Sequence, residues 1–247
     1  MTLRTDDLEF CYGDRDVLHG TNFTAEEGEV TVLLGRNGAG KSTLLKHFNG
    51  LLEPDGGRVL VDGEVLEYDG DSLEGLRRRV GLVFQNPEDQ LIAPTVRQDV
   101  AFGPENMGTL EGTDVDAALA DVGLDGYEDR LCHSLSHGEK KRVALAGVLV
   151  MDPDYVIMDE PTAGLDGDGS NQIVSLIESL AERDITLLLS THHVGFALEV
   201  ADTLVVLEDG RTVYRDRTID RETAAEYGLR TFSFDNHAVD AGHSLLD

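Results

Sequence analysis

The chain contains the run Gly35-Arg36-Asn37-Gly38-Ala39-Gly40-Lys41-Ser42-Thr43 between an apolar stretch, residues 30–34, and a helix-patterned stretch, residues 44–48. A P-loop needs this setting, in which a strand enters a glycine-rich turn and a helix leaves it. Glycines let backbone N–H groups approach phosphate oxygens, and the start of the helix adds its positive end. Lysine supplies a point charge, and serine a hydroxyl for Mg²⁺. The run therefore predicts a nucleoside triphosphate site made by Gly35, Asn37, Gly38, Gly40, Lys41, Ser42 and Thr43.

The charge of the chain is strongly negative. Its 247 residues include 48 acids against 20 lysines and arginines, for a formal charge of −28. Such a surface repels a polyphosphate backbone, so we expect no nucleic-acid partner. The same excess suits molar salt, where the Debye length shrinks to about 3 Å. We hypothesise a protein from a salt-accumulating halophile, the alternative being an ordinary acidic protein. Thermal stability that is already complete at low KCl would exclude the first.

The cysteines and the hydropathy of the chain indicate its cellular compartment. Cys11 and Cys132 are far apart and lack metal-ligand spacing, which indicates reduced thiols rather than a disulfide. Residues 1–7 lack the apolar core of a signal peptide. No uninterrupted apolar run approaches the roughly 18 residues that span a bilayer. We expect a soluble intracellular chain that reaches a membrane only through a partner.

Strand and helix patterns alternate along the chain. Alternating apolar and polar positions predict short strands within 3–33, and helical spacing follows in 44–51. The pattern is mainly helical from about 88 to 150, and the tail from 216 to 247 is polar, so its structure stays open. Further strands are predicted at 59–61, 80–84, 155–158, 185–189 and 204–207, with an amphipathic helix burying Ile173, Val174, Ile177 and Leu180. This α/β alternation implies a parallel sheet covered by helices on both faces.

A second acidic motif follows one of the predicted strands. The run Tyr155-Val156-Ile157-Met158-Asp159-Glu160 is an apolar strand that ends in two acids. Neighbouring strand residues point to opposite faces, so one carboxylate can meet the metal while the next addresses a water. We assign Asp159 to Mg²⁺ and Glu160 to the water as general base.

The run Leu135-Ser136-His137-Gly138-Glu139 lies ahead of these acids. With it, the chain resembles the ATP-binding-cassette (ABC) ATPases over roughly residues 3–215. The resemblance implies an ABC-ATPase domain over 1–215, with a mixed β-sheet core, an N-terminal antiparallel β subdomain and a helical signature subdomain at about 88–150. It also implies that Ser136 and Gly138 complete the ATP site of another subunit. A head-to-tail dimer would then hold two ATP molecules.

Further roles follow from the resemblance at matching positions. Tyr12 would stack on adenine, Asp166 would lie at the dimer seam, and His192 would touch the γ-phosphate, with His193 as a bystander. Gln85 would sense Mg²⁺ and water and couple to the transport partner. The implied catalytic residues are therefore Glu160, His192, Gln85 and Lys41, and the implied Mg²⁺ contacts are Ser42, Gln85 and Asp159.

The signature run departs from the family's commonest form in two places. His137 replaces a glycine and Glu139 replaces a glutamine. The imidazole could crowd the phosphate, or it could point away while its backbone N–H still donates. Because Ser136 and Gly138 are kept, we expect hydrolysis to survive, the alternative being a degenerate site that does not hydrolyse ATP.

One branch of the family fits best. The segment from Gln85 to Leu91, with 94–96 and 99–106 after it, is similar to the ATPases of energy-coupling-factor and cobalt or nickel importers. In that branch, residues just after the glutamine dock a helix of a transmembrane subunit. We therefore expect an ATPase peripheral to the cytoplasmic face of the membrane, using ATP and Mg²⁺ to power uptake of a transition-metal ion or vitamin.

Other interpretations stay open. Importers of amino acids or other small molecules share the catalytic motifs, and the working dimer could pair two copies or this chain with a paralogue. A soluble ABC protein acting on DNA or ribosomes would typically carry a second cassette or a coiled coil, and this sequence has neither. A small-molecule kinase would share the P-loop but not residues 135–139 or His192.

Overall fold

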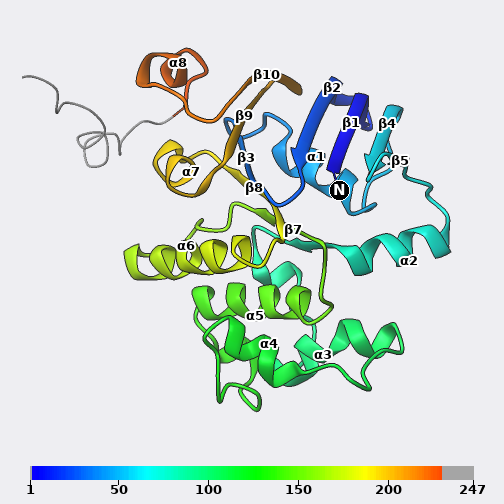
Figure 1. Cartoon of the computed structure of the whole chain (residues 1–247), viewed down its shortest axis with the longest axis vertical. Coiled ribbons are helices and arrows are strands. Elements are labelled where there is room, and N and C mark those ends of the chain that lie inside the picture. The colour runs from blue at the N-terminus through cyan, green and yellow to red at the C-terminus, as the bar shows by residue number, and fades with distance from the viewer. Residues whose placement is uncertain (1, 230–247) are drawn as a thin grey trace, which may run out of the picture.

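The structure is a computed structural model, and it describes residues 2–229. Two β-sheets lie side by side, with helices around them (Figure 1). A four-stranded antiparallel sheet has the order β2-β1-β4-β5, and a six-stranded sheet has the order β10-β9-β3-β8-β7-β6. The first sheet comprises β1 (Thr2–Tyr12), β2 (Arg15–Glu26), β4 (Gly56–Val61) and β5 (Glu64–Val65). The second comprises β3 (Val30–Leu34), β6 (Val80–Val83), β7 (Tyr155–Asp159), β8 (Thr186–Thr191), β9 (Thr203–Glu208) and β10 (Arg211–Asp216).

Five strands of the larger sheet run parallel, and β10 pairs antiparallel with β9. The sheet is therefore mixed, as the resemblance implied. The register brings the ends of three strands together, because Leu34 pairs with Thr191 and Asp159 pairs with Ser190. The P-loop, the acidic pair and the histidine that follows β8 consequently leave the same edge of the sheet.

The larger sheet is buried on both faces. Along β3, Val32 and Leu34 pack into a core shared with the helices, whereas Leu33 packs into a second core shared with the antiparallel sheet. This alternation is the two-residue period of a strand. Helices pack on both faces, as predicted, but one of these faces is also covered by the antiparallel sheet. The residues on that face come from α1 (Lys41–Phe48), from Leu76 of α2 (Gly70–Arg79) and from the antiparallel sheet, because the apolar residues of β1, β2 and β4 need burial as well.

The region predicted to be helical holds three α-helices, which gather on one side of the larger sheet (Figure 1). Helix α3 (Val96–Asn106) starts with a capping box, because the side chains of Thr95 and Gln98 each accept a hydrogen bond from the other residue's backbone N–H. Val115 and Leu119 of the second helix are buried in the helical core. The helices are α3 (Val96–Asn106), α4 (Val115–Asp121) and α5 (His137–Leu149), and 3₁₀ turns lie at η1 (Pro87–Asp89) and η2 (Cys132–Ser134).

The remaining helices are α2 (Gly70–Arg79), α6 (Gly167–Ala181), α7 (Val194–Val200) and α8 (Arg221–Glu226). Helix α6 buries the four predicted residues, Ile173, Val174, Ile177 and Leu180. Helix α8 lies in the tail whose structure the sequence left open, and Ile219, Ala224 and Leu229 anchor it in the helical core. Residues 230–247 of that tail lie outside the described residues. None of the helices within residues 2–229 is both long and apolar enough to cross a bilayer.

One predicted helical position is wrong. Leu51, the last residue of the helical spacing predicted at 44–51, lies outside the helix and is 43% exposed. Helix α1 ends at Phe48 because Gly50 adopts a φ of 65°, and the N–H groups of Gly50 and Leu51 turn back to the carbonyls of His47 and Lys46. Glycine permits this left-handed ending at low cost.

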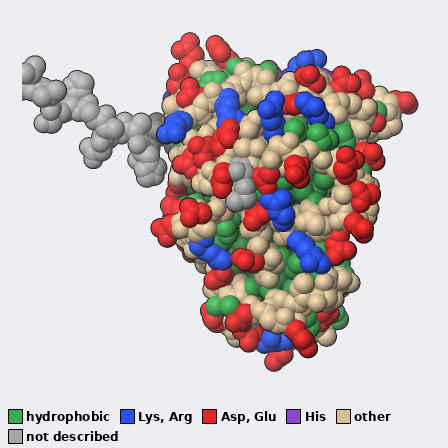
Figure 2. Space-filling model, turned by 45° about the vertical axis from the view of Figure 1, so that its right-hand side comes forward, with side chains coloured by type: hydrophobic (Ala, Val, Ile, Leu, Met, Phe, Trp, Pro, Cys, Tyr) green, Lys and Arg blue, Asp and Glu red, His purple; other side chains and the backbone are tan. Residues whose placement is uncertain are grey.

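Acidic side chains spread over the face seen in Figure 2, with lysines and arginines scattered among them. Several basic side chains are paired there or elsewhere on the surface, as in the Arg183–Asp121 pair at 2.6 Å. Such exposed pairs contribute little stability and are screened by salt. The excess of negative charge therefore makes ionic strength a variable that every association experiment on this protein has to control.

Candidate active site

The P-loop holds its lysine in place through the loop's own backbone. Lys41 is 6% exposed, and its Nζ donates to the carbonyl of Gly35 at 2.8 Å. Gly38 and Gly40 adopt φ values of 88° and 104°, which only glycine takes readily. Helix α1 begins at Lys41 with no side-chain cap and no acid in its first turn. Its first N–H groups are therefore available to an anion.

Glu160 lies in contact with two of the predicted site residues. Its Oε1 is 3.3 Å from Lys41 Nζ, and both carboxylate oxygens lie 3.0 Å from Nδ1 of His192. Glu160 is 4% exposed and has a φ of 47°, a conformation unusual for a non-glycine residue. Its N–H donates to the carbonyl and to the Oγ of Ser190 on β8. Strand β8 thus supports the unusual backbone that directs this carboxylate.

Asp159 ends β7 and is 8% exposed, and its carboxylate accepts a hydrogen bond from the Ser190 hydroxyl. Ser42 lies in the first turn of α1. A carboxylate and a hydroxyl fit Mg²⁺, which is usually held by one or two carboxylates together with substrate phosphates. Within residues 2–229, no cluster of three or more His, Cys, Asp or Glu residues could hold a metal alone. The phosphates and water would therefore complete the coordination.

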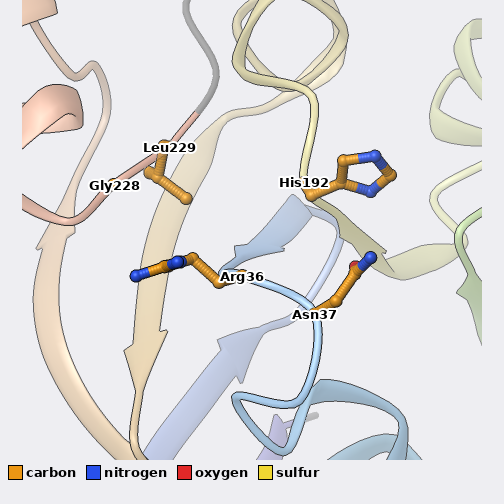
Figure 3. Close-up of a pocket in the computed structure, with 5 residues that line it drawn as sticks. All are labelled: Arg36, Asn37, His192, Gly228 and Leu229. Carbon is orange, nitrogen blue, oxygen red and sulfur yellow. The ribbon is translucent and has the colours of Figure 1, made fainter.

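A cavity of about 290 Å³ opens beside the P-loop, lined by Arg36, Asn37, His192, Gly228 and Leu229. Asn37 lies below His192 on one side, and Arg36 lies below Gly228 and Leu229 on the other (Figure 3). A Cβ on Gly228 would come within 3.2 Å of the Arg36 side chain. Sequence reasoning missed Arg36, Gly228 and Leu229 as cavity residues, because nothing in a polar tail indicates that it returns to the P-loop.

Tyr12 ends β1 with 48% of its surface exposed, so its ring is accessible to a flat ligand. Its edge meets Phe10 at a centroid distance of 4.8 Å, and Phe10 contacts His47 of α1 at the same distance. His47 is fully buried. Its Nδ1–H donates to the Thr43 carbonyl at 2.7 Å, and its Nε2 has no hydrogen-bond partner among the described residues. Burial holds the pKa of His47 below its ordinary value of 6.5.

This histidine gives the fold a pH dependence. Below pH 6.5 the unfolded chain binds a proton that folded His47 resists, so the free energy of unfolding falls as the pH falls. Through this one group, the free energy of unfolding changes by at most about 1.4 kcal/mol per pH unit. We expect His47→Met to flatten the dependence of denaturant unfolding between pH 6.5 and 5, at fixed ionic strength. His133→Gln, at an exposed position, is the control, and an equal flattening in both variants would contradict the assignment.

The predicted Gln85 follows β6 and is exposed. A second glutamine, which sequence reasoning missed, holds this region. Gln90 accepts from the Phe84 N–H at 2.9 Å and donates to the Leu82 carbonyl at 3.2 Å. The Gln90 side chain therefore continues the backbone pairing of β6 and fixes the point where the chain leaves the sheet.

The signature run begins α5. Ser136 caps the helix and forms a capping box with Glu139, whose carboxylate accepts from the Ser136 N–H at 2.8 Å and from the Tyr127 hydroxyl at 2.8 Å. The N–H of Ser136 is the main cause that lowers the pKa of Glu139. Glutamate at this position therefore has a local function in starting the helix.

The His137 ring lies against Gly164. A Cβ on Gly164, whose φ is 77°, would come within 3.2 Å of His137 Nε2. A Cβ on Gly138 would similarly meet Leu165 at 3.4 Å. The start of α5 thus packs on segment 163–165. No hydrogen bond joins Ser136 or Gly138 to the P-loop within residues 2–229.

The last two predicted positions lie near the site's edges. Asp166 caps α6, its carboxylate accepting from the Gly169 N–H at 2.8 Å, and its side chain is exposed. The ring of His193 lies 4.0 Å from that of His192, and the His193 N–H donates to the Thr191 hydroxyl. The structure therefore groups Lys41, Glu160 and His192 in one contact set, with Tyr12, Gln85, Ser136 and Asp166 outside it.

Comparison with known proteins gives a consistent result. The sequence profile of the family described as "ABC transporter" matches residues 18–163. A putative ABC transporter ATP-binding protein of Archaeoglobus fulgidus is 52% identical over 92% of this chain and 78% of that protein. The energy-coupling factor transporter ATP-binding protein EcfA of Methanocaldococcus jannaschii is 49% identical over 85% of this chain and 76% of that protein. Among solved structures, cbiO1 from Clostridium perfringens, part of the ABC transporter complex cbiONQ, has a TM-score of 0.78 at 40% identity, covering 87% of this chain and 88% of that one.

Proposed function

Because the chain belongs to the ABC transporter family and is the Mg²⁺-dependent ATPase subunit of such a transporter, we propose that it powers uptake of a transition-metal ion or a vitamin through separate membrane subunits. The observation that carries this proposal is the likeness to EcfA and to cbiO1, which extends over more than four fifths of the chain. The proposed place of work is the cytoplasmic face of the membrane, reached through those subunits.

The contact set around Glu160 supports a hydrolytic role. In the proposed reaction, the Glu160 carboxylate accepts a proton from a water whose oxygen bonds to the γ-phosphorus. The bond from that phosphorus to the bridging oxygen breaks, and ADP and phosphate are released. Lys41 would neutralise phosphate charge, and His192 would orient the carboxylate that it contacts. Bound Mg²⁺ would neutralise further phosphate charge, held by Ser42, Asp159 and Gln85.

The signature residues support a site shared between two subunits. Ser136 is exposed, lies at a helix start, and has no hydrogen bond to the P-loop of its own chain within residues 2–229. A helix start that carries a serine is suited to an anion. We propose that Ser136 and Gly138 contact the γ-phosphate bound by the other subunit, whether a second copy or a paralogue, with Asp166 at the seam and Tyr12 on adenine.

A groove beside the segment that follows Gln85 supports docking of a membrane subunit. Its cavity of about 250 Å³ is lined by Glu88, Leu91, Ile92, Ala93, Pro94, Cys132, His133 and Lys140. Ile92 is 63% exposed, a large value for an isoleucine. Glu88 and Lys140 form an ion pair of 2.6 Å beside Ile92, and this pair joins the segment after Gln85 to α5. An amphipathic helix with an apolar face is the kind of partner that such a groove accepts.

Co-expression with membrane subunits of an energy-coupling-factor transporter from the same organism tests the proposal. We expect the complex to co-purify and to take up radiolabelled cobalt, nickel or a vitamin, but only while Glu160 is intact. Ile92→Glu should abolish co-purification, because it places a charge in the apolar contact. Val65→Glu is the matched control, since Val65 is also exposed but lies on β5 of the antiparallel sheet. Energised uptake of an amino acid in place of the metal or vitamin would refute the proposed cargo.

A further inference from the structure

A buried lysine lies behind the active site and has no part in the mechanism above. The chain has four lysines, and two of them are buried, Lys41 of the P-loop and Lys141 of α5. Lys141 is 3% exposed, although it lies only five residues after the exposed Ser136. Burying an ammonium group is costly unless it is fully hydrogen-bonded. Its partners therefore indicate what the position does.

All three hydrogen bonds of Lys141 go to one short segment. Its Nζ donates to the carbonyls of Glu160 at 3.0 Å, Pro161 at 3.0 Å and Ala163 at 2.8 Å. An ammonium group has three donors, so these bonds satisfy it completely. Burial lowers the pKa of Lys141 to about 8, and the negative charges of Glu160 and Asp159 oppose that shift. The ammonium is thus held by the residues that immediately follow the general base.

The first of these carbonyls belongs to a strained residue. Glu160 has a φ of 47°, and this left-handed conformation is unfavourable for a residue that carries a Cβ. Its N–H is fixed by Ser190 of β8, and its C=O is fixed by Lys141 of α5. The backbone of Glu160 is thus hydrogen-bonded at both its N–H and its C=O, by two different elements of the fold. Removing either support would allow the backbone to relax and the carboxylate to turn.

We propose that Lys141 is a positioning residue that holds the Glu160 carboxylate in its reactive orientation and ties it to the signature helix. This inference rests on the roles proposed above for Glu160 and Ser136. Helix α5 begins at the residues that would contact the ATP of the other subunit. One turn later, Lys141 of the same helix donates a hydrogen bond to the carbonyl of Glu160. Movement of the helix start on dimer closure would therefore be transmitted to Glu160 of the same chain.

The test compares Lys141→Met with the matched variant Arg142→Met. Methionine keeps an unbranched side chain and removes all three donors. Arg142 is the next residue of α5 and also donates to loop carbonyls, those of Val122 and Gly123, but away from Glu160. We expect Lys141→Met to lower kcat by roughly 10- to 100-fold, since misplacing a catalytic group by about 1 Å can have that effect. The KM and the Kd for ATP should change by less than about threefold, because the P-loop is untouched.

Each outcome has a defined meaning. Lys141→Gln, which keeps a polar head on a shorter side chain, should reproduce the loss of kcat with ATP binding retained. The inference is overturned if both Lys141 variants hydrolyse ATP within about threefold of wild type while Glu160→Gln is inactive. It is also overturned if both variants lose ATP binding, because Lys141 would then serve folding alone, or if Arg142→Met loses kcat equally. Full activity of Glu160→Gln would instead refute the proposed role of Glu160.

Discussion

Glu160→Gln lowers the rate of ATP hydrolysis by about 10²- to 10⁴-fold, the range that a general base contributes. The amide is nearly isosteric with the carboxylate and can still hydrogen-bond to His192, but it cannot accept a proton from water. ATP binding should be retained, because the P-loop glycines and Lys41 are unchanged. The measurement is phosphate release at saturating ATP and Mg²⁺, with the Kd for ATP determined in parallel.

Glu178→Gln provides the control for Glu160→Gln. Glu178 is an exposed acid on α6, so its substitution removes the same charge from the chain without touching the site. We expect wild-type hydrolysis from it. Equal rates for wild type and Glu160→Gln would show that another group takes the proton, and the assignment of the base would have to be abandoned.

Lys41→Met is expected to weaken ATP binding by about 30-fold or more and to stop hydrolysis at any practical nucleotide concentration. Loss of one member of a buried, hydrogen-bonded charge pair typically costs about 2–5 kcal/mol, and about 1.4 kcal/mol is tenfold in affinity. Two effects add here. The triphosphate loses its cationic contact, and Glu160, which is 3.3 Å away and almost fully buried, loses its neutralising neighbour.

The control for this variant lies on the same helix. Lys46→Met removes a lysine of α1 one turn and a half further on, where the side chain is partly exposed. Titration of a fluorescent ATP analogue should give a Kd close to wild type for Lys46→Met and a much larger one for Lys41→Met. Similar values for both variants would mean that overall charge, rather than the contact at Lys41, governs nucleotide affinity.

The parts of the site that could be predicted from sequence are those whose geometry is local. Gly38 and Gly40 are needed by the turn itself, and Lys41 follows at a fixed distance along the chain. The pair Asp159 and Glu160 could be assigned because a strand ends at the first of them. Parallel pairing then brings these segments to the same edge of the sheet without further information.

The parts that could not be predicted depend on contacts distant in sequence. The bond from Lys141 to Glu160 joins residues on two elements, and no spacing rule relates a helix to a particular loop. The return of Gly228 to Arg36 is of the same kind. Helix α2 has one buried residue, Leu76, so few apolar positions mark it in the sequence. Leu51 was misplaced because Gly50 ends the helix one turn earlier than the apolar spacing suggests.

The signature run shows how a departure from a family pattern can be interpreted once contacts are known. The sequence alone left open whether His137 would crowd the phosphate. In the structure its ring lies against Gly164, and Glu139 completes the capping box of α5. Neither substitution therefore removes the Ser136 hydroxyl or the helix start from the surface. We therefore still expect the protein to hydrolyse ATP with His137 and Glu139 in the signature run.

The central claim is that ATP held by Lys41 of one subunit is closed over by Ser136 of another. Sedimentation of Glu160→Gln with saturating ATP and Mg²⁺, at low and at molar KCl, tests it most directly. Our account predicts an ATP-dependent dimer that returns to monomer when ATP is withheld or when Ser136→Arg is added to the variant. A protein that stays monomeric with ATP at every concentration and salt, with or without its membrane subunits, would contradict the account.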